Sequence, residues 1–217
     1  MSNLILIIGE SGTGKSTSIE SLDPKETFII QVINKPLPFR GYRKNYPLIK
    51  DGVGNRYISD DYLNIIRLIN HISSKMPHIK TVIVDDFQYI LSNEFIRKAT
   101  EKGFDKFTLM AQHYYEIITA AGSAREDLNI IFLSHSEKKE DGSTKVKTIG
   151  KLLDEKITVE GLFTIVLNTE VENGEYYFVT QNNGNNTSKS PKGMFEDFKI
   201  PNDLNYVVTK INEYYGG

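Results

Sequence analysis

Eight residues close to the N-terminus have the types and the spacing needed to hold a phosphate group. The pattern G-x-x-x-x-G-K-[ST] is matched without deviation by Gly9-Glu10-Ser11-Gly12-Thr13-Gly14-Lys15-Ser16, and Thr17 comes next. Glycines let backbone N–H groups turn inward around a phosphate, and Lys15 can reach the β- and γ-phosphates of a triphosphate. The hydroxyl of Ser16 suits Mg²⁺. We therefore expect residues 9–17 to bind ATP together with Mg²⁺.

Two neighbouring carboxylates stand at the end of a later apolar run. Asp85 and Asp86 follow Thr81–Val84, which places them at the carboxyl end of a buried strand, where open α/β sheets bind ligands. We assign Asp85 to Mg²⁺, through water. Asp86 could polarise the attacking water or cap the next helix. His135 ends another apolar run and could sense the γ-phosphate, or could simply be hydrogen-bonded at a strand end.

The elements that must position these side chains follow from the apolar pattern. Near-continuous, β-branched runs, typical of strands buried on both faces of a parallel sheet, lie at Leu4–Ile8, Thr27–Ile33, Thr81–Val84 and Asn129–Leu133. Helical patterns separate these runs, at Lys15–Leu22, at Asp60–Lys75 and from Phe87 through Ala121. We predict an α/β fold in which helices flank a mostly parallel, twisted sheet.

After these runs the pattern changes. A polar stretch, Ser136–Thr148, leads to a short predicted helix at Lys151–Lys156. Two strand-like runs follow, Leu162–Val171 and Glu175–Thr180, and the Asn173-Gly174 pair between them indicates a tight turn. The sheet is therefore expected to end in an antiparallel hairpin.

Length and composition are those of one globular domain. The chain has 217 residues, of which 39% are hydrophobic and 25% charged. We expect a single domain over 1–217, with a core of about 3–195 and a C-terminal extension at 196–217. No run approaches the roughly 20 apolar residues that span a bilayer, so no membrane partner is expected, and the first residues lack the features of a signal peptide. With no cysteine and a net charge of −2, thiolate metal sites are excluded and any nucleic acid needs a local basic patch.

The order of these motifs resembles that of phage-encoded RecA-like ATPases, and more narrowly the single-strand-annealing type that keeps only the RecA core. The resemblance runs from Leu4 to about Phe195 and includes Lys35–Gly41 and the tail Thr187–Phe195. It implies a RecA-like P-loop NTPase that assembles on single-stranded DNA in phage recombination, in the cytoplasm of an infected bacterial host. It also implies a homo-oligomer with nucleotide at subunit interfaces, and a single-strand-binding protein as a further partner.

The resemblance carries residue roles as well. Ser134-His135 would be the polar sensor, Ser136–Thr148 the DNA-binding loop, and Lys189 a catalytic cation that reaches the γ-phosphate of a neighbouring subunit. In one respect the chain departs from the family. RecA-type enzymes place a glutamate just after the second core strand, whereas Phe28–Asn34 holds no carboxylate. Either Asp86 takes this role or hydrolysis is slow.

Basic and aromatic residues alternate in a segment without any acidic residue, Thr27–Lys50. Single-stranded nucleic acid is bound by cationic side chains that contact its phosphate backbone and by aromatic rings that stack on its bases. A solvated loop docked on the core would have the same composition. The predicted DNA contacts are Lys35, Arg40, Tyr42, Arg43 and Lys44 here, with Lys138, Lys139, Lys145 and Lys147 in the polar stretch.

Two other classes of function remain open. A small-molecule or nucleotide kinase needs an arginine-rich lid, yet only Arg125 lies between Ala99 and the C-terminus. A regulatory switch NTPase would have binding as its output. The Asn-Lys-x-Asp signature of guanine-specific switches is not completed by Asn34-Lys35-Pro36-Leu37, which favours ATP over GTP.

Overall fold

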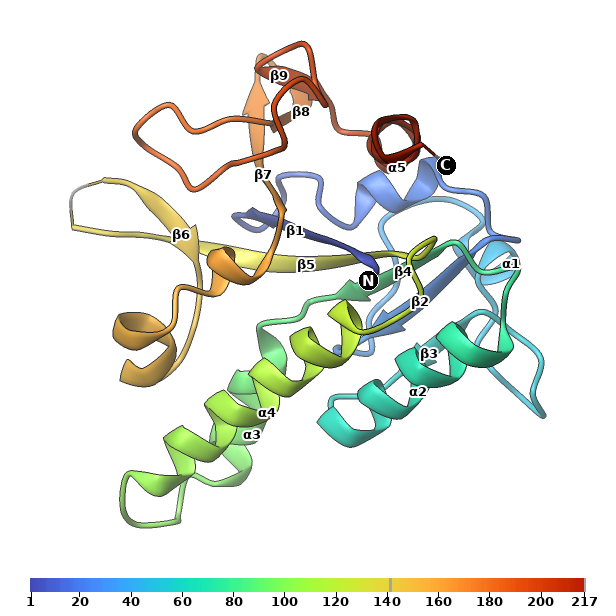
Figure 1. Cartoon of the computed structure of the whole chain (residues 1–217). Coiled ribbons are helices and arrows are strands. Elements are labelled where there is room, and N and C mark those ends of the chain that lie inside the picture. The colour runs from blue at the N-terminus through green and yellow to red at the C-terminus, as the bar shows by residue number, and fades with distance from the viewer. Residues whose placement is uncertain (141, 217) are drawn as a thin grey trace.

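The computed structural model describes residues 1–140 and 142–216, except for the side chains of Asp154 and Glu155. The described strands form one sheet in the order β3-β2-β4-β5-β1-β7-β8-β9, and β6 pairs with the far end of β5 (Figure 1). Their bounds are β1 Asn3–Gly9, β2 Thr27–Gln31, β3 Arg56–Ile58, β4 Thr81–Asp85, β5 Asn129–Lys138, β6 Thr144–Val146, β7 Ile165–Glu172, β8 Glu175–Val179 and β9 Lys199–Pro201.

The first part of the sheet is parallel, as the apolar runs predict. β1 lies between β5 and β7, and β4 lies between β2 and β5, all in parallel. Parallel strands bring their carboxyl ends to one edge, so Gly9, Asp85 and His135 meet there although they are far apart in the sequence. The mixed α/β architecture is confirmed.

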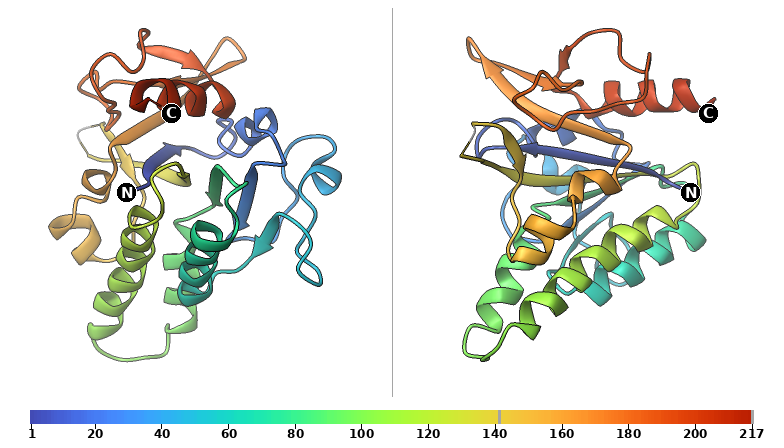
Figure 2. Two further views of the ribbon diagram at one scale, coloured as in Figure 1. Left: turned by 45° about the vertical axis from the view of Figure 1, so that its right-hand side comes forward. Right: turned by 60° about the vertical axis from the view of Figure 1, so that its left-hand side comes forward.

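Helices lie on both faces of the sheet (Figures 1 and 2), and an apolar layer fills the space on each face. Along β1, Leu6 and Ile8 join the core beneath α2 (Tyr62–Lys75), α3 (Tyr89–Arg97) and α4 (Asp105–Gly122). Ile5 and Ile7 join the opposite core, beneath the 3₁₀-helix η1 (Thr17–Ser21) and α5 (Leu204–Tyr215). The alternation is the two-residue period of a strand buried on both faces.

Two predicted helices differ from those observed. After the phosphate loop the helix expected at Lys15–Leu22 is the short 3₁₀-helix η1. Its serines and threonine are poor helix formers, and Pro24 follows closely. The pattern from Phe87 through Ala121 is divided into α3 and α4, because the chain turns between them at Gly103, whose φ is +92°.

The C-terminal half contains the predicted antiparallel hairpin. β7 and β8 pair in antiparallel fashion around Asn173 and Gly174, whose φ values of +52° and +81° are those of a tight hairpin turn. The short helix expected at Lys151–Lys156 is the π-helix η2, Leu152–Lys156, and the 3₁₀-helix η3, Val159–Leu162, follows it.

Two segments predicted to lie outside the sheet, the loop Ser136–Thr148 and the extension 196–217, contain further paired strands. The polar stretch expected to be a loop contains the end of β5 and β6, which pair from Ser136 with Val146 to Lys138 with Thr144. Within the expected extension, β9 adds to the sheet edge and α5 buries its apolar face against η1. Within residues 1–140 and 142–216, no helix has the length and apolar character required to cross a bilayer.

Candidate functional site

The phosphate loop leaves the end of β1 and is held in a tight turn. Gly12 and Gly14 have φ values of +80° and +93°, a region that side chains rarely adopt. The loop also rests on the C-terminal strands. The hydroxyls of Thr13 and Thr169 share a hydrogen bond of 2.5 Å, and a Cβ added at Gly9 would lie 1.7 Å from Thr169 Oγ1. On the other side, a Cβ at Gly14 would lie 2.9 Å from both Asn202 and Tyr176.

Lys15 is turned back onto its own loop. Its Nζ donates hydrogen bonds to the carbonyl oxygens of Gly9 (2.8 Å) and Glu10 (2.7 Å), and the residue is buried. Burial lowers the pKa of Lys15 to about 8, although the carboxylates of Asp86 and Asp85 act in the opposite direction. To bind a nucleotide, the Lys15 ammonium must therefore replace its hydrogen bonds to the two carbonyl oxygens with hydrogen bonds to phosphate oxygens.

Ser16 and Asp85 supply the oxygen atoms that could hold Mg²⁺. Ser16 Oγ donates to Asp85 Oδ1 at 2.8 Å, and Asp85 Oδ2 is buried without a hydrogen-bond partner. Burial, and then the neighbouring charge of Asp86, raise the pKa of Asp85 to about 6. A hard divalent cation suits this orphaned oxygen and the adjacent hydroxyl. In the described part of the chain no cluster of three or more His, Asp or Glu could hold a metal alone, so phosphate oxygens would have to complete the shell.

Asp86 occupies an unusual backbone position at the start of the next segment. Its φ is +62°, and its carboxylate is only 4% exposed. Lys35 Nζ lies 2.7 Å from Asp86 Oδ2, and His135 Nε2 lies 4.0 Å from Asp86 Oδ1. Among the described residues, no backbone N–H of α3 donates to the Asp86 carboxylate, and the side chain of Gln88, the N-cap residue, makes no capping hydrogen bond. The geometry thus favours a role in the cavity over helix capping.

His135 lies on β5, beside Gly9 of β1, and is fixed by its backbone. Its N–H donates to Gln88 Oε1 at 3.1 Å, and its ring meets Tyr89 edge to face. Burial lowers the pKa of His135, and the positive charge of Lys15 adds to this effect. A neutral imidazole at this place can exchange a hydrogen bond with a phosphate or a water molecule.

One cavity of about 300 Å³ beside the phosphate loop is lined by Lys15, Ser16, Asp86 and His135 together. Its lining comprises Ser11, Gly12, Gly14, Lys15, Ser16, Thr17, Lys35, Pro36, Pro38, Asp86, His135 and Tyr176. Three predicted catalytic residues, Lys15, Asp86 and His135, are therefore brought together. Lys35, expected from the sequence to contact DNA, also lines the cavity. Pro36, Pro38 and Tyr176 carried no chemical signal in the sequence.

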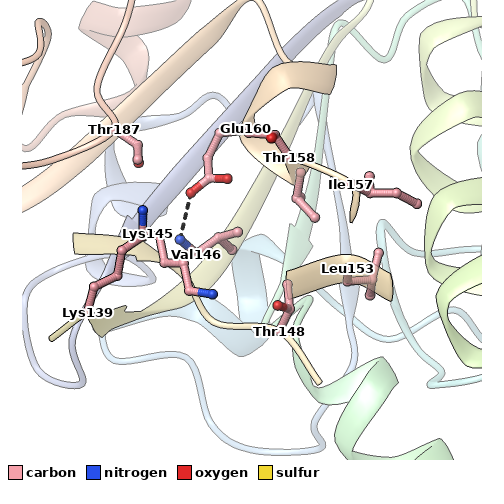
Figure 3. Close-up of a pocket in the computed structure, with 10 residues that line it drawn as sticks. Lys139, Lys145, Val146, Thr148, Leu153, Ile157, Thr158, Glu160 and Thr187 are labelled. Carbon is pink, nitrogen blue, oxygen red and sulfur yellow. Dashed lines mark hydrogen bonds between the residues drawn. The ribbon is translucent and has the colours of Figure 1, made fainter. Parts of the chain in front are cut away.

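Lys189, the fourth predicted catalytic residue, lies elsewhere in its own subunit. Its backbone exchanges two hydrogen bonds with Val166 of β7, at 2.8 and 2.9 Å. Burial lowers the pKa of Lys189, and Glu160 opposes that effect. Glu160 closes a second, smaller cavity of about 120 Å³ and accepts a hydrogen bond from the Val146 N–H at 2.8 Å (Figure 3). Lys189 is therefore not among the residues that line the nucleotide cavity.

The remaining predicted DNA contacts fall into two separate groups. The short helix α1, Tyr42–Asn45, carries Arg43 and Lys44. It lies near the amino end of β2, because Asn55 Nδ2 donates to the carbonyls of both Thr27 and Asn45. Tyr42 packs against the core, and its ring has Arg56 at 5.3 Å and Arg43 at 5.7 Å.

The second group lies at the other end of the strands. Lys138 and Lys145 belong to the β5–β6 hairpin, while Lys139 follows β5 and Lys147 follows β6. Lys138 Nζ lies 3.6 Å from Glu10 Oε1, which places this hairpin beside the phosphate loop. The two groups therefore do not form one continuous basic strip.

The fold and the cavity together define a P-loop NTPase domain. Comparison with known proteins agrees: the chain belongs to the AAA domain family, whose sequence profile matches residues 1–191. Among solved structures, the chain is similar to the genome packaging NTPase B204 from Sulfolobus turreted icosahedral virus 2, solved in complex with ATP-gammaS. That similarity has 11% identity and a TM-score of 0.44, over 79% of this chain and 76% of the other. No curated protein sequence matches the chain.

Proposed function

We propose that this protein is an Mg²⁺-dependent ATPase that acts on single-stranded DNA in phage recombination, by annealing or strand pairing. One observation carries the proposal. β5 is continuous from Asn129 through His135 to Lys138, so the strand that reaches the nucleotide cavity also begins the basic β5–β6 hairpin. We expect a shift of His135 on ATP binding to be transmitted along this strand to the lysines of the hairpin, where DNA would bind.

At the nucleotide the loop provides backbone N–H groups for the phosphates, and Lys15 moves from the carbonyls of Gly9 and Glu10 to the β- and γ-phosphates. Ser16 and Asp85 would hold Mg²⁺, which neutralises phosphate charge when bound. Asp86 faces the same cavity and would accept a proton from the water that attacks the γ-phosphorus, so that ADP and inorganic phosphate are the products.

DNA would be bound by the β5–β6 hairpin and its flanking lysines. The ion pair between Lys145 and Glu137 at 3.0 Å joins its two strands, while Lys138 is 70% exposed. Phosphate contacts of such lysines give sequence-independent, salt-sensitive binding. The group around α1 is a second candidate, with its cations exposed but with Tyr42 partly used for packing.

We further propose that subunits assemble with nucleotide at their interfaces and that Lys189 acts on the neighbouring site. Lys189 is half-buried against β7 and does not line its own nucleotide cavity, which supports a role outside its own subunit. A cation that arrives only on assembly would couple hydrolysis to oligomerisation, as an arginine finger does.

The test is ATP hydrolysis measured with and without single-stranded oligonucleotide, together with fluorescence anisotropy across a salt series in the presence of a non-hydrolysable ATP analogue. We expect salt-sensitive binding and faster hydrolysis with DNA, and no hydrolysis by Lys15→Ala. If wild-type protein hydrolyses ATP but does not bind the oligonucleotide, the proposed ATPase activity stands and the proposed action on DNA is overturned.

Paired variants then locate the DNA surface. Lys138→Ala with Lys139→Ala should flatten the salt dependence by about 0.7 unit in log K per log salt for each lost phosphate contact. Arg40→Ala with Arg43→Ala tests the group near α1 in the same way. The matched control replaces Lys75 and Lys102, exposed lysines outside both groups, and should leave the slope unchanged.

A further inference from the structure

Lys35 is a second lysine in the nucleotide cavity, and its position there is specific. Its Nζ lies 2.7 Å from Asp86 Oδ2, and its side chain remains 43% exposed, whereas the Asp86 carboxylate is 4% exposed. Lys35 lines the same cavity as Lys15 and Ser16. The ammonium therefore stands between a buried carboxylate and the space that a triphosphate would enter.

The backbone that carries this lysine is firmly held. Its N–H donates to the carbonyl of Ile33, and its own carbonyl accepts a hydrogen bond from Gln31 Nε2 at 3.2 Å. Gln31 is 1% exposed and accepts in turn from Arg56 Nη1 at 2.8 Å. Leu37, two residues beyond Lys35, is buried in the core. A fixed backbone with a half-exposed side chain places the ammonium at a defined spot at low entropic cost.

The Lys35 ammonium lies among several charged groups around Asp86. Asp86 is faced by Lys15, Lys35, Asp85 and His135, and a lone carboxylate at this wall would repel the terminal phosphate of ATP. An ammonium has three donors, so Lys35 can keep one hydrogen bond to Asp86 and offer another to a phosphate oxygen. In that arrangement it bridges the two anions and holds Asp86 beside the attacked phosphorus.

We propose that Lys35 is a phosphate-binding residue that contacts the γ-phosphate of ATP, and that it thereby distinguishes ATP from ADP. The proposal rests on the proposed ATPase function and adds a discriminating contact to that site. The loop N–H groups take up the inner phosphates, so the wall formed by Lys35, Asp86 and His135 is left for the terminal one. Removal of the γ-phosphate leaves Lys35 with Asp86 alone.

The experiment compares the dissociation constants of fluorescent analogues of ADP and of a non-hydrolysable ATP, with Mg²⁺, for wild type, Lys35→Met and Lys35→Arg. A charge-assisted hydrogen bond contributes about 1.5–3 kcal/mol, so Lys35→Met should weaken ATP-analogue binding by about 10- to 150-fold. Affinity for ADP should stay within about twofold. Lys35→Arg should recover most of the difference. Lys75→Met, at an exposed lysine that does not line the cavity, is the matched control and should change neither constant.

A purely structural role for Lys35, as the partner of Asp86, makes a different prediction. Lys35→Met would then weaken both nucleotides equally, and the double variant Lys35→Met with Asp86→Asn would regain wild-type discrimination because no buried charge is left unpaired. Either result overturns the proposal. If the double variant still fails to distinguish ATP from ADP, the proposal is supported. This measurement also tests the proposal if Lys35→Met alone fails to fold. Wild-type protein that binds neither nucleotide would instead overturn the ATPase function itself.

Discussion

Burial of Asp85 makes the stability of the nucleotide-free protein depend on pH in a direction opposite to that of most carboxylates. Its pKa is about 6 in the folded chain, against 3.8 for the free side chain. Between these values the native state binds a proton that the unfolded state does not. Stability therefore rises as pH falls through 6, and is lost again as pH rises.

The size of the effect follows from the shift. Between pH 7 and pH 5 the native carboxyl takes up nearly one proton, which corresponds to about 1.4 kcal/mol of added stability. For a chain of this length that amounts to about 3–5 °C in melting temperature. Asp85→Asn keeps an oxygen for the Ser16 hydroxyl but cannot titrate, so it should lack this contribution.

The assay is thermal or urea unfolding of both proteins in EDTA at pH 7, 6 and 5. Groups far from Asp85 titrate equally in the two proteins, so the difference between their stability curves reports Asp85 together with its effect on the neighbouring Asp86 and Lys15. We expect wild type to gain on the variant by about 1.4 kcal/mol as pH falls from 7 to 5. If the two stability curves are parallel, or if wild type loses stability relative to the variant as pH falls, then burial does not raise the pKa of Asp85.

Three further predictions follow from the site. Gly9→Ala should lower the melting temperature by about 5 °C or more, because its Cβ would meet Thr169 Oγ1 at 1.7 Å, and Thr169→Ala in the same chain should restore part of the loss. Asp86→Asn should lower kcat while the dissociation constant of the ATP analogue stays close to that of wild type, and unchanged kcat in steady-state hydrolysis would remove Asp86 from the chemistry. Lys15→Ala and Lys189→Ala proteins, each inactive alone, should regain some hydrolysis when mixed, and no recovery at any ratio would count against action across subunits.

The phosphate loop could be predicted from the sequence because its conformation is encoded locally. Gly12 and Gly14 stand where the backbone needs positive φ, and β1 precedes them as a continuous apolar run. The β7–β8 hairpin was predictable for the same reason, from Asn173 and Gly174. In both cases a few adjacent residues determine the geometry.

The position of Lys35 could not be predicted in this way. In the sequence it begins a basic and aromatic segment, and nothing nearby indicates that Asp86, 51 positions later, would lie against it. The contact arises because β2 and β4 are neighbours in the sheet, with Gln31 beside Asp85. Composition also could not show that the segment turns back, so that Tyr46 becomes buried near Leu22. Such placements depend on strand order, which is a property of the whole fold.

The contacts beneath the phosphate loop bear on how far this chain can be shortened. Thr13 and Gly14 rest on Thr169 and Asn202, and Asn202 follows β9, beyond the point where the sequence places the end of the core. A truncation after residue 195 would keep every residue of the G-x-x-x-x-G-K-[ST] pattern yet remove Asn202, β9 and the α5 face that covers η1. We therefore expect a folded, active ATPase unit to need β9 and α5, because the phosphate loop packs against Asn202 and η1 packs against α5.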